Sequence, residues 1–205
     1  KKPMILSTGM AYKNEIKQAL GIAKKFIKKN NLALLKCTSI YPASYKNLNL
    51  KSIKTFKRDF GVPIGYSDHS LGYEATLTAV GLGANVIEKH FTLNKKAKGA
   101  DHHISLEPKE FKKMVEMIRN IELSLGSEII KPVKDEIKQR KKFHRYLVAS
   151  QNLKKGLIIK REHINTQRVK NLNKNTFEAK KLEILIGKKL KKNIKKGQQL
   201  SHILL

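Results

Sequence analysis

Two hydrophobic spacings alternate along the first 126 residues. Short continuous apolar runs are typical of buried strands, and apolar residues three or four positions apart are typical of amphipathic helices. The predicted strands cover residues 3–8, 32–37, 62–66 and 85–91, and the predicted helices cover about residues 16–27, 50–60, 72–82 and 108–125. Strands that alternate with helices in this way predict an α/β fold with a parallel sheet.

Four strand–helix units amount to half of an eight-unit (β/α)8 barrel, which needs about 250 residues. The sequence begins with Lys1, inside a predicted strand, rather than with Met. We therefore expect residues 1–126 to form half of such a barrel, with an N-terminal truncation. A small open sheet is the alternative, but polar residues at every predicted strand end argue against it.

The rest of the chain has a different character. Residues 127–145 are charged and lack an apolar stripe, which predicts a linker. In residues 146–205, the segments NLKKG (152–156) and NIKKG (193–197) form a near-repeat. Glycine after two lysines suits a tight turn between short strands. We expect a small, mostly β domain with internal pseudo-symmetry over residues 146–205.

The formal net charge is +28, from 44 Lys and Arg against 16 Asp and Glu. A nucleic-acid-binding module is one reading of such a charge. The basic residues are mostly Lys, however, and aromatic residues do not interleave with Arg as a base-stacking surface requires. A compositional bias toward Lys, Ile and Asn is the simpler explanation, and the positive field would attract small anionic substrates.

Neither a membrane protein nor a secreted disulfide scaffold fits the sequence. No apolar run approaches the roughly 18 residues that a membrane-spanning helix needs, and residues 1–10 lack the apolar stretch of a signal peptide. Cys37 is the single cysteine, which excludes an internal disulfide and favours a reducing compartment. We expect a cytoplasmic protein that binds neither membrane nor nucleic acid.

Polar residues end every predicted strand. The four ends read Ser7-Thr8-Gly9, Cys37-Thr38-Ser39 followed by Tyr41, Ser67-Asp68-His69 and Glu88-Lys89-His90. Parallel α/β folds place function at the C-terminal ends of strands, so these residues predict a functional site. The period of two puts Glu88 and His90 on one strand face with Lys89 on the other, and likewise pairs Ser67 with His69.

Two histidines in this set suggest a metal site. His69 and His90 follow successive strands, so their imidazoles could converge on one divalent ion that keeps open positions for substrate. Glu88 would bind the ion directly or through water. His69, His90 and Glu88 are thus the predicted catalytic residues. The alternative is that each histidine is an ordinary polar residue at a strand end.

Three serines suggest a phosphate site. Ser7, Ser39 and Ser67 lie at the mouths of three strands, with loop amides and helix N-termini behind them. The alternative is that they cap the helices that follow.

Five segments of the chain resemble the second half of the barrel in bacterial sialic acid synthases. They are LSTGMA (6–11), LLKCTSIYPAS (34–44), PIGYSDHSLGYEA (63–75), GANVIEKHFTL (83–93) and GADHHISLEPKEF (99–111). The tail from Tyr146 resembles the antifreeze-like (SAF, β-clip) domain of that family. The resemblance implies that residues 1–126 are strands 5–8 of a TIM barrel and that residues 146–205 are the SAF domain.

This resemblance also implies an activity. The family condenses phosphoenolpyruvate with an N-acetylated amino sugar, typically N-acetylmannosamine, to give a sialic acid and phosphate. It acts as a domain-exchanged homodimer and uses manganese or magnesium. By correspondence of motifs, His69 and His90 hold the metal; Ser7, Ser39 and Ser67 bind phosphate; Tyr41 and Asp101 contact the sugar; and Arg168 reaches the N-acetyl group from the partner subunit.

Two departures from the family pattern matter. The usual Arg-Pro-Gly of the tail reads Arg168-Val169-Lys170 here. Residues 1–205 do not include the family's first four strands, which carry its lysine and glutamate groups for phosphoenolpyruvate, so residues 1–205 alone are expected to be inactive. A synthase of legionaminic or pseudaminic acid is the nearest alternative, and residues 101–108 favour the sialic or legionaminic type. A non-catalytic remnant of the fold is a further alternative.

Overall fold

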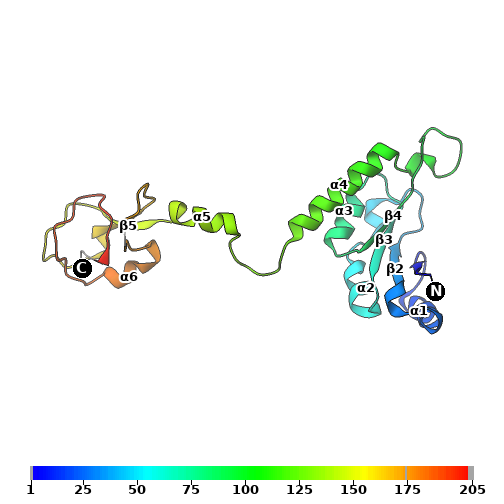
Figure 1. The fold of residues 1–205 in the computed structure, drawn as a ribbon, viewed down its shortest axis with the longest axis horizontal. Helices are drawn as coiled ribbons and strands as arrows, with labels where there is room; N and C mark the ends of the chain where they lie inside the picture. Colours follow the sequence, from blue (N-terminus) through cyan, green and yellow to red (C-terminus); the bar gives the residue numbers. More distant parts are fainter. Residues whose placement is uncertain (1, 174, 203–205) are drawn as a thin grey trace. The chain divides into compact units, whose positions relative to one another are not determined.

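The computed structural model describes residues 2–173 and 175–202. The chain divides into two compact units, Lys1–Glu128 and Ile129–Leu205 (Figure 1). Each unit has its own hydrophobic core. The outer ends of the two predicted domains, Lys1 and residues 203–205, lie outside the described residues.

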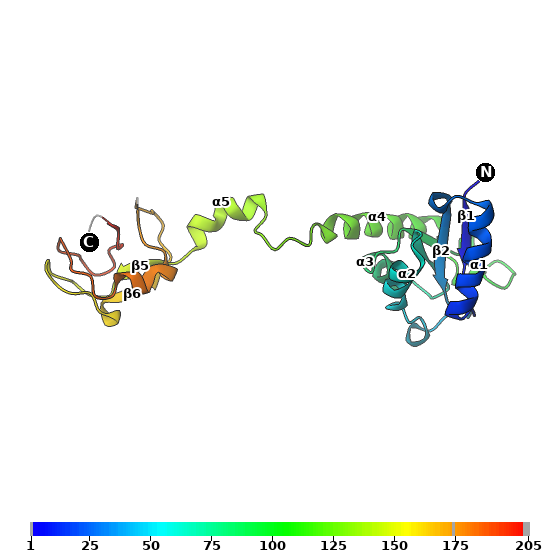
Figure 2. The same cartoon turned by 90° about the horizontal axis from the view of Figure 1, so that it is seen from below.

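The first unit alternates strands and helices. In chain order these are β1 (Met4–Ser7), α1 (Lys13–Phe26), β2 (Leu32–Cys37), α2 (Ser52–Phe60), β3 (Ile64–Asp68), α3 (Glu74–Gly81), β4 (Val86–Lys89) and α4 (Pro108–Leu125). The sheet order is β1-β2-β3-β4, and every neighbouring pair is parallel. Figure 2 shows β1 beside β2, with α1 alongside. Each strand therefore lies next to the following strand of the chain.

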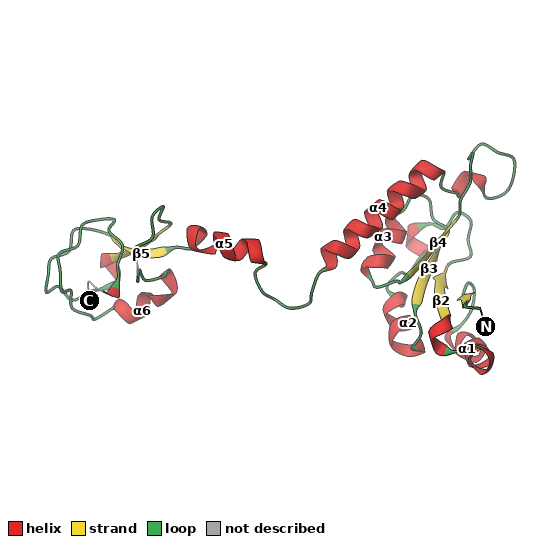
Figure 3. Ribbon diagram, viewed as in Figure 1, coloured by secondary structure: helices red, strands yellow, loops and turns green. Residues whose placement is uncertain are grey.

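Helices cover one face of this sheet. Leu32 and Leu34 of β2 and Ile64 and Tyr66 of β3 pack against α1, α2 and α3, through Ile16, Leu20, Ala23, Ile53, Phe60, Ala75 and Ala79. A doubly wound sheet carries helices on both faces, whereas a barrel carries them outside only. The unit is a curled parallel half-barrel (Figure 3), which confirms the predicted fold class.

β2 has its predicted bounds, whereas β1, β3 and β4 each differ from theirs by one or two residues at each end. β3 begins at Ile64 rather than at residue 62 and continues through Asp68. Pro63 has no N–H to donate to the ladder, although its carbonyl accepts a bond of 3.0 Å from the Leu34 N–H. β4 ends at Lys89, so His90 follows the strand directly.

The second unit is built mostly of loops and short bridges (Figure 3). β5 (Tyr146–Ala149) pairs antiparallel with β6 (Ile164–Gln167), and α6 (Leu182–Leu185) contributes Leu185 to the core. Helix α5 (Lys134–Phe143) lies within the segment predicted as a linker. The Val133 N–H donates to Glu136 Oε2 at 2.9 Å, so a local cap begins this charged helix without an apolar stripe.

The near-repeat forms two turns that bond to each other. The Lys155 N–H donates to Asn193 Oδ1 at 2.7 Å, and the Lys196 N–H donates to Asn152 Oδ1 at 2.9 Å. Between the turns, Leu153 pairs antiparallel with Ile194. The two turns are thus related by an approximate two-fold axis, as the near-repeat predicts.

Over residues 2–173 and 175–202, no helix combines the length and the apolar character needed to cross a lipid bilayer.

Gly65 of β3 permits the close approach of its neighbouring strands. A Cβ atom there would overlap the Val86 carbonyl oxygen and the Leu35 side chain. We expect Gly65→Ala to lower the free energy of unfolding by about 1–3 kcal/mol, because the backbone of β4 cannot yield without losing its ladder. Denaturant unfolding measures this change.

The control for this variant is Gly21→Ala in α1, where an added Cβ meets no atom within 4 Å. Helix propensity should raise its stability by about 0.5–1 kcal/mol. Equal stabilities for the two variants would contradict the close-approach explanation.

Candidate functional site

The register of β3 and β4 organises the site. Ser67 lies opposite Glu88, and Asp68 lies opposite Lys89. His69 and His90 come directly after these pairs, and their ring centroids are 5.1 Å apart with an interplanar angle of 89°. The two imidazoles that the sequence places at successive strand ends therefore lie in edge-to-face contact in the structure.

His69 is held in one orientation. Its side chain is buried, and Nδ1 lies 2.9 Å from the carbonyl oxygen of Thr38, which follows β2. A carbonyl can only accept, so Nδ1 carries the proton and Nε2 keeps its lone pair. Nε2 lies 3.4 Å from Ser67 Oγ.

The segment that supplies this carbonyl is fixed by Lys36. The Lys36 amine donates to Thr38 Oγ1 at 2.6 Å and to the Cys37 carbonyl at 3.1 Å. Lys36 is buried, and burial lowers the pKa of its amine. Sequence reasoning did not assign a role to Lys36 or to the Thr38 carbonyl.

His90 and Asp101 form a more open pair. His90 Nδ1 lies 3.7 Å from Asp101 Oδ2, and the two side chains are 26% and 49% exposed. Ser105 Oγ donates to the Asp101 carbonyl at 2.7 Å, which fixes the loop that carries Asp101. Asp101 thus reaches the histidine pair from a loop after β4.

Tyr41 covers the two histidines from the β2 side. Its ring centroid lies 4.2 Å from that of His69, with an interplanar angle of 31°, and 5.7 Å from that of His90. Partial burial raises the pKa of the Tyr41 hydroxyl, and Cys37, Asp101 and Glu88 add to the rise. The phenol therefore stays protonated as a hydrogen-bond donor beside two carboxylates.

Ser67 and Glu88 share a hydrogen bond on the same face as the histidines. The Ser67 hydroxyl donates to Glu88 Oε1 at 2.6 Å. Ser67 is buried and Glu88 is exposed. The Ser67 proton is thus committed to Glu88 in this structure.

The other two serines lie at the ends of the first two strands. Ser39 Oγ is 3.7 Å from Cys37 Sγ, which is itself 3.9 Å from His69 Nδ1. A Cβ at Gly9 would overlap Ser39 Oγ, so this glycine makes room for the hydroxyl. Ser7 is exposed and ends β1 opposite Leu35.

Arg168 belongs to the second unit and follows β6. It is exposed, and its guanidinium carbon lies 5.6 Å from the centroid of the Phe143 ring at the end of α5. This cation–π contact leaves its N–H groups at the surface.

The two histidines fit a divalent metal with an open coordination shell. Rings with centroids 5.1 Å apart are close enough for His69 and His90 to hold one ion between them. The His69 Nδ1 bond to a carbonyl is the outer contact that metal-binding histidines usually make. In the described part of the chain, no group of three or more His, Cys, Asp or Glu residues could enclose an ion. Water and substrate would complete the shell.

Sequence reasoning missed the buried pair on the other face of the sheet. Lys89 Nζ lies 3.0 Å from Asp68 Oδ2, and both side chains are 0% exposed. The sequence did contain a signal for this pair. Asp68 and Lys89 carry opposite charges, and each directly precedes one of the two histidines. The alternation of side chains along the strands puts both on the face that packs against the helices.

Two regions of the chain match known families. Residues 1–130 match the NeuB family, and residues 144–202 match the SAF domain. The chain is 42% identical over 198 residues to an N,N'-diacetyllegionaminic acid synthase of Campylobacter jejuni, covering 96% of this chain and 58% of that protein. It is 40% identical over 200 residues to a pseudaminic acid synthase of the same species, covering 98% of this chain and 57% of that protein. The chain therefore spans less than two thirds of these relatives.

A solved structure is also similar to this chain. The N-acetylneuraminic acid (sialic acid) synthetase of Leptospira borgpetersenii, determined in complex with citrate, has a TM-score of 0.62 to this chain and is 42% identical. The match covers 68% of this chain and 48% of that one.

The stack of Tyr41 on His69 can be measured directly. We expect Tyr41→Leu to shift the ring-proton NMR signals of His69, because an aromatic ring 4.2 Å away shields those protons and leucine does not. The control is Tyr73→Leu, since the Tyr73 ring faces Lys113 instead. Unchanged His69 signals in Tyr41→Leu would show that the two rings do not stack in solution.

Proposed function

Because the chain belongs to the NeuB family and carries an SAF domain, we propose that the protein is a synthase of nonulosonic acids. It condenses phosphoenolpyruvate with an N-acetylated amino sugar and releases phosphate. The observation that carries this proposal is the close edge-to-face pair of His69 and His90 at adjacent strand ends.

The histidines would hold manganese or magnesium. When bound, the ion supplies a Lewis acid that polarises the aldehyde of the open-chain sugar. The protein orients that site: the Thr38 carbonyl keeps the His69 proton on Nδ1 and leaves Nε2 as the ligand atom. Asp101 lies beside His90, close enough to accept a hydrogen bond from a sugar hydroxyl bound there.

Ser7, Ser39 and Ser67 would bind the phosphate of phosphoenolpyruvate. The contact with Gly9 supports this role for Ser39, since the hydroxyl occupies the room that a Cβ at Gly9 would take and so lies beside the end of β1. Ser67 must turn its proton from Glu88 to donate to a phosphate. Glu88 is then free to accept a proton when water adds to the condensed intermediate.

The sugar is the finer part of the proposal. We favour the sialic or legionaminic type, with N-acetylmannosamine as the first candidate and a pseudaminic precursor as the alternative. The motif over residues 101–108 supports this choice, as does the identity to a legionaminic acid synthase. Arg168 would clamp the N-acetyl group from the SAF domain of a partner subunit in a domain-exchanged homodimer, in the cytoplasm.

Metal binding tests the role of the histidines. We expect His69→Ala and His90→Ala each to weaken Mn²⁺ binding at least tenfold, because each removes one of two protein ligands. Electron paramagnetic resonance of free Mn²⁺ measures the affinity. His103→Ala, which alters an exposed histidine of the same unit, is the control and should bind as the unaltered protein does. Unchanged affinity in His69→Ala would refute the metal role.

Product analysis tests the sugar. The protein expressed from its complete reading frame is incubated with phosphoenolpyruvate, Mn²⁺ and each candidate amino sugar. We expect phosphate and a nonulosonic acid from N-acetylmannosamine or the legionaminic precursor, with turnover reduced roughly 100-fold or more in His69→Ala. Turnover with the pseudaminic precursor alone would overturn the proposed sugar class but not the reaction.

A further inference from the structure

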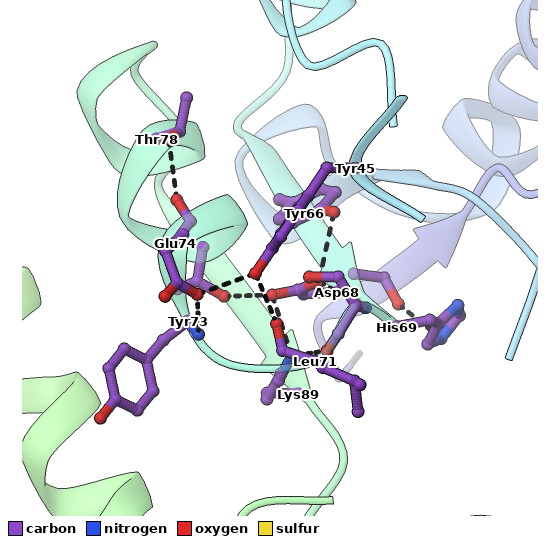
Figure 4. A network of polar contacts seen from close by, with 12 residues as sticks. Tyr45, Tyr66, Asp68, His69, Leu71, Tyr73, Glu74, Thr78 and Lys89 are labelled. Carbon is purple, nitrogen blue, oxygen red and sulfur yellow. Dashed lines mark hydrogen bonds and ion pairs between the residues drawn. The ribbon is translucent and has the colours of Figure 1, made fainter. Parts of the chain in front are cut away.

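Behind the two histidines lies a buried ion pair that the proposed chemistry does not use. Asp68 and Lys89 are register partners of β3 and β4, and their side chains point toward the helices. Lys89 Nζ is 3.0 Å from Asp68 Oδ2, and both side chains are fully buried. Figure 4 shows the pair with its polar neighbours.

The Asp68 carboxylate is saturated with donors. Oδ1 accepts from the Tyr66 hydroxyl at 3.3 Å, the Ser70 N–H at 2.9 Å and the Ser70 hydroxyl at 2.7 Å. Oδ2 accepts from the Thr76 hydroxyl at 2.7 Å in addition to Lys89. Burial, followed by the Asp68 charge, raises the pKa of Tyr66, so its phenol stays a donor. The charge is therefore fully compensated.

This network binds the residues next to each histidine in the chain. Asp68 precedes His69 and holds Ser70, which follows it, while Lys89 precedes His90 and donates to the Ser70 carbonyl. Tyr45 extends this network, since the single proton of its hydroxyl is shared between the Leu71 carbonyl at 3.0 Å and Glu74 Oε2 at 2.9 Å (Figure 4). One buried cluster thus fixes both strand ends relative to each other.

Stability alone does not explain such a pair. A buried ion pair can often be replaced by apolar residues of similar volume at little or no cost, because removing two charges from water is expensive. An apolar pair would fill the same space, but it could not bond to the Ser70 N–H, hydroxyl and carbonyl. The directional bonds are what the ion pair adds.

We propose that Asp68 and Lys89 are positioning residues that hold His69 and His90 at the separation needed for one divalent cation. The inference rests on the proposed metal role of the histidines. It assigns Asp68 and Lys89 no contact with substrate or metal; they act through the backbone on either side of His69 and before His90.

The test distinguishes a change in the position of the two histidines from a change in the stability of the fold. The double variant Asp68→Leu/Lys89→Met, made in the protein expressed from its complete reading frame, keeps an apolar filling. Arg119→Met/Glu122→Gln, which removes an exposed ion pair of 2.7 Å on α4, is the matched control. Thermal unfolding, Mn²⁺ affinity and the imidazole ¹⁵N signals of metal-free protein are measured for each.

We expect the double variant to unfold cooperatively at a lower temperature, because the donors to Asp68 lose their acceptor, yet to stay folded at about 25 °C and to bind Mn²⁺ there about 10–100-fold more weakly. The ¹⁵N signals of His69 and His90 should broaden or shift without metal. The control should match the unaltered protein in all three measurements. A double variant with unaltered affinity and unaltered histidine signals would overturn the inference.

Two further outcomes are decisive. If the double variant does not fold, Asp68→Asn, which keeps the side-chain size and removes the charge, is measured in its place. Unaltered affinity and histidine signals in that variant also overturn the inference. If His69→Ala leaves Mn²⁺ affinity unchanged, the proposed metal role fails; if it abolishes binding while the Asp68 and Lys89 variants bind normally, only the positioning role fails.

Discussion

The parallel register of β3 against β4 is the constraint on which the site depends. Side chains alternate along a strand, so a slip of one residue would exchange the two faces. It would carry Ser67 and His69 in among the helices and turn Asp68 away from them. Ile64 and Tyr66 prevent this, because their burial against the helices is lost in any other register. The hydrophobic core thereby determines where the polar chemistry is displayed.

The two faces of the half-barrel treat polar groups in opposite ways. On the helix side, Asp68 has five donors and Lys89 is fully buried, so this cluster is closed and rigid. On the other side, His90 and Asp101 lie 3.7 Å apart, and both side chains are accessible to solvent. A layer of polar groups that are fully hydrogen-bonded to one another, beneath polar groups that can still bind a ligand, is the arrangement expected of a preorganised binding site.

Sequence reasoning could predict the elements and the face of each strand-end residue, because periods of two and of three to four are local properties. β2 was predicted with its observed bounds, whereas Pro63 delayed the start of β3 through its missing N–H. The Thr38 carbonyl that orients His69 could not be predicted, since a backbone acceptor leaves no mark on residue type. The Asp68–Lys89 pair required the register, which depends on both strands at once. Helix α5 escaped prediction because its cap, not an apolar stripe, defines it.

The paired turns of the second unit depend on each other. The Asn152 side chain satisfies the backbone of the later turn, and the Asn193 side chain satisfies that of the earlier one. Each turn closes one bond of its own, from the Leu157 N–H to the Lys154 carbonyl and from the Gln198 N–H to the Lys195 carbonyl, and leaves another N–H to the asparagine of the other turn. Loss of either asparagine would therefore leave a backbone donor unpaired in the opposite copy of the motif, so the two copies stabilise each other.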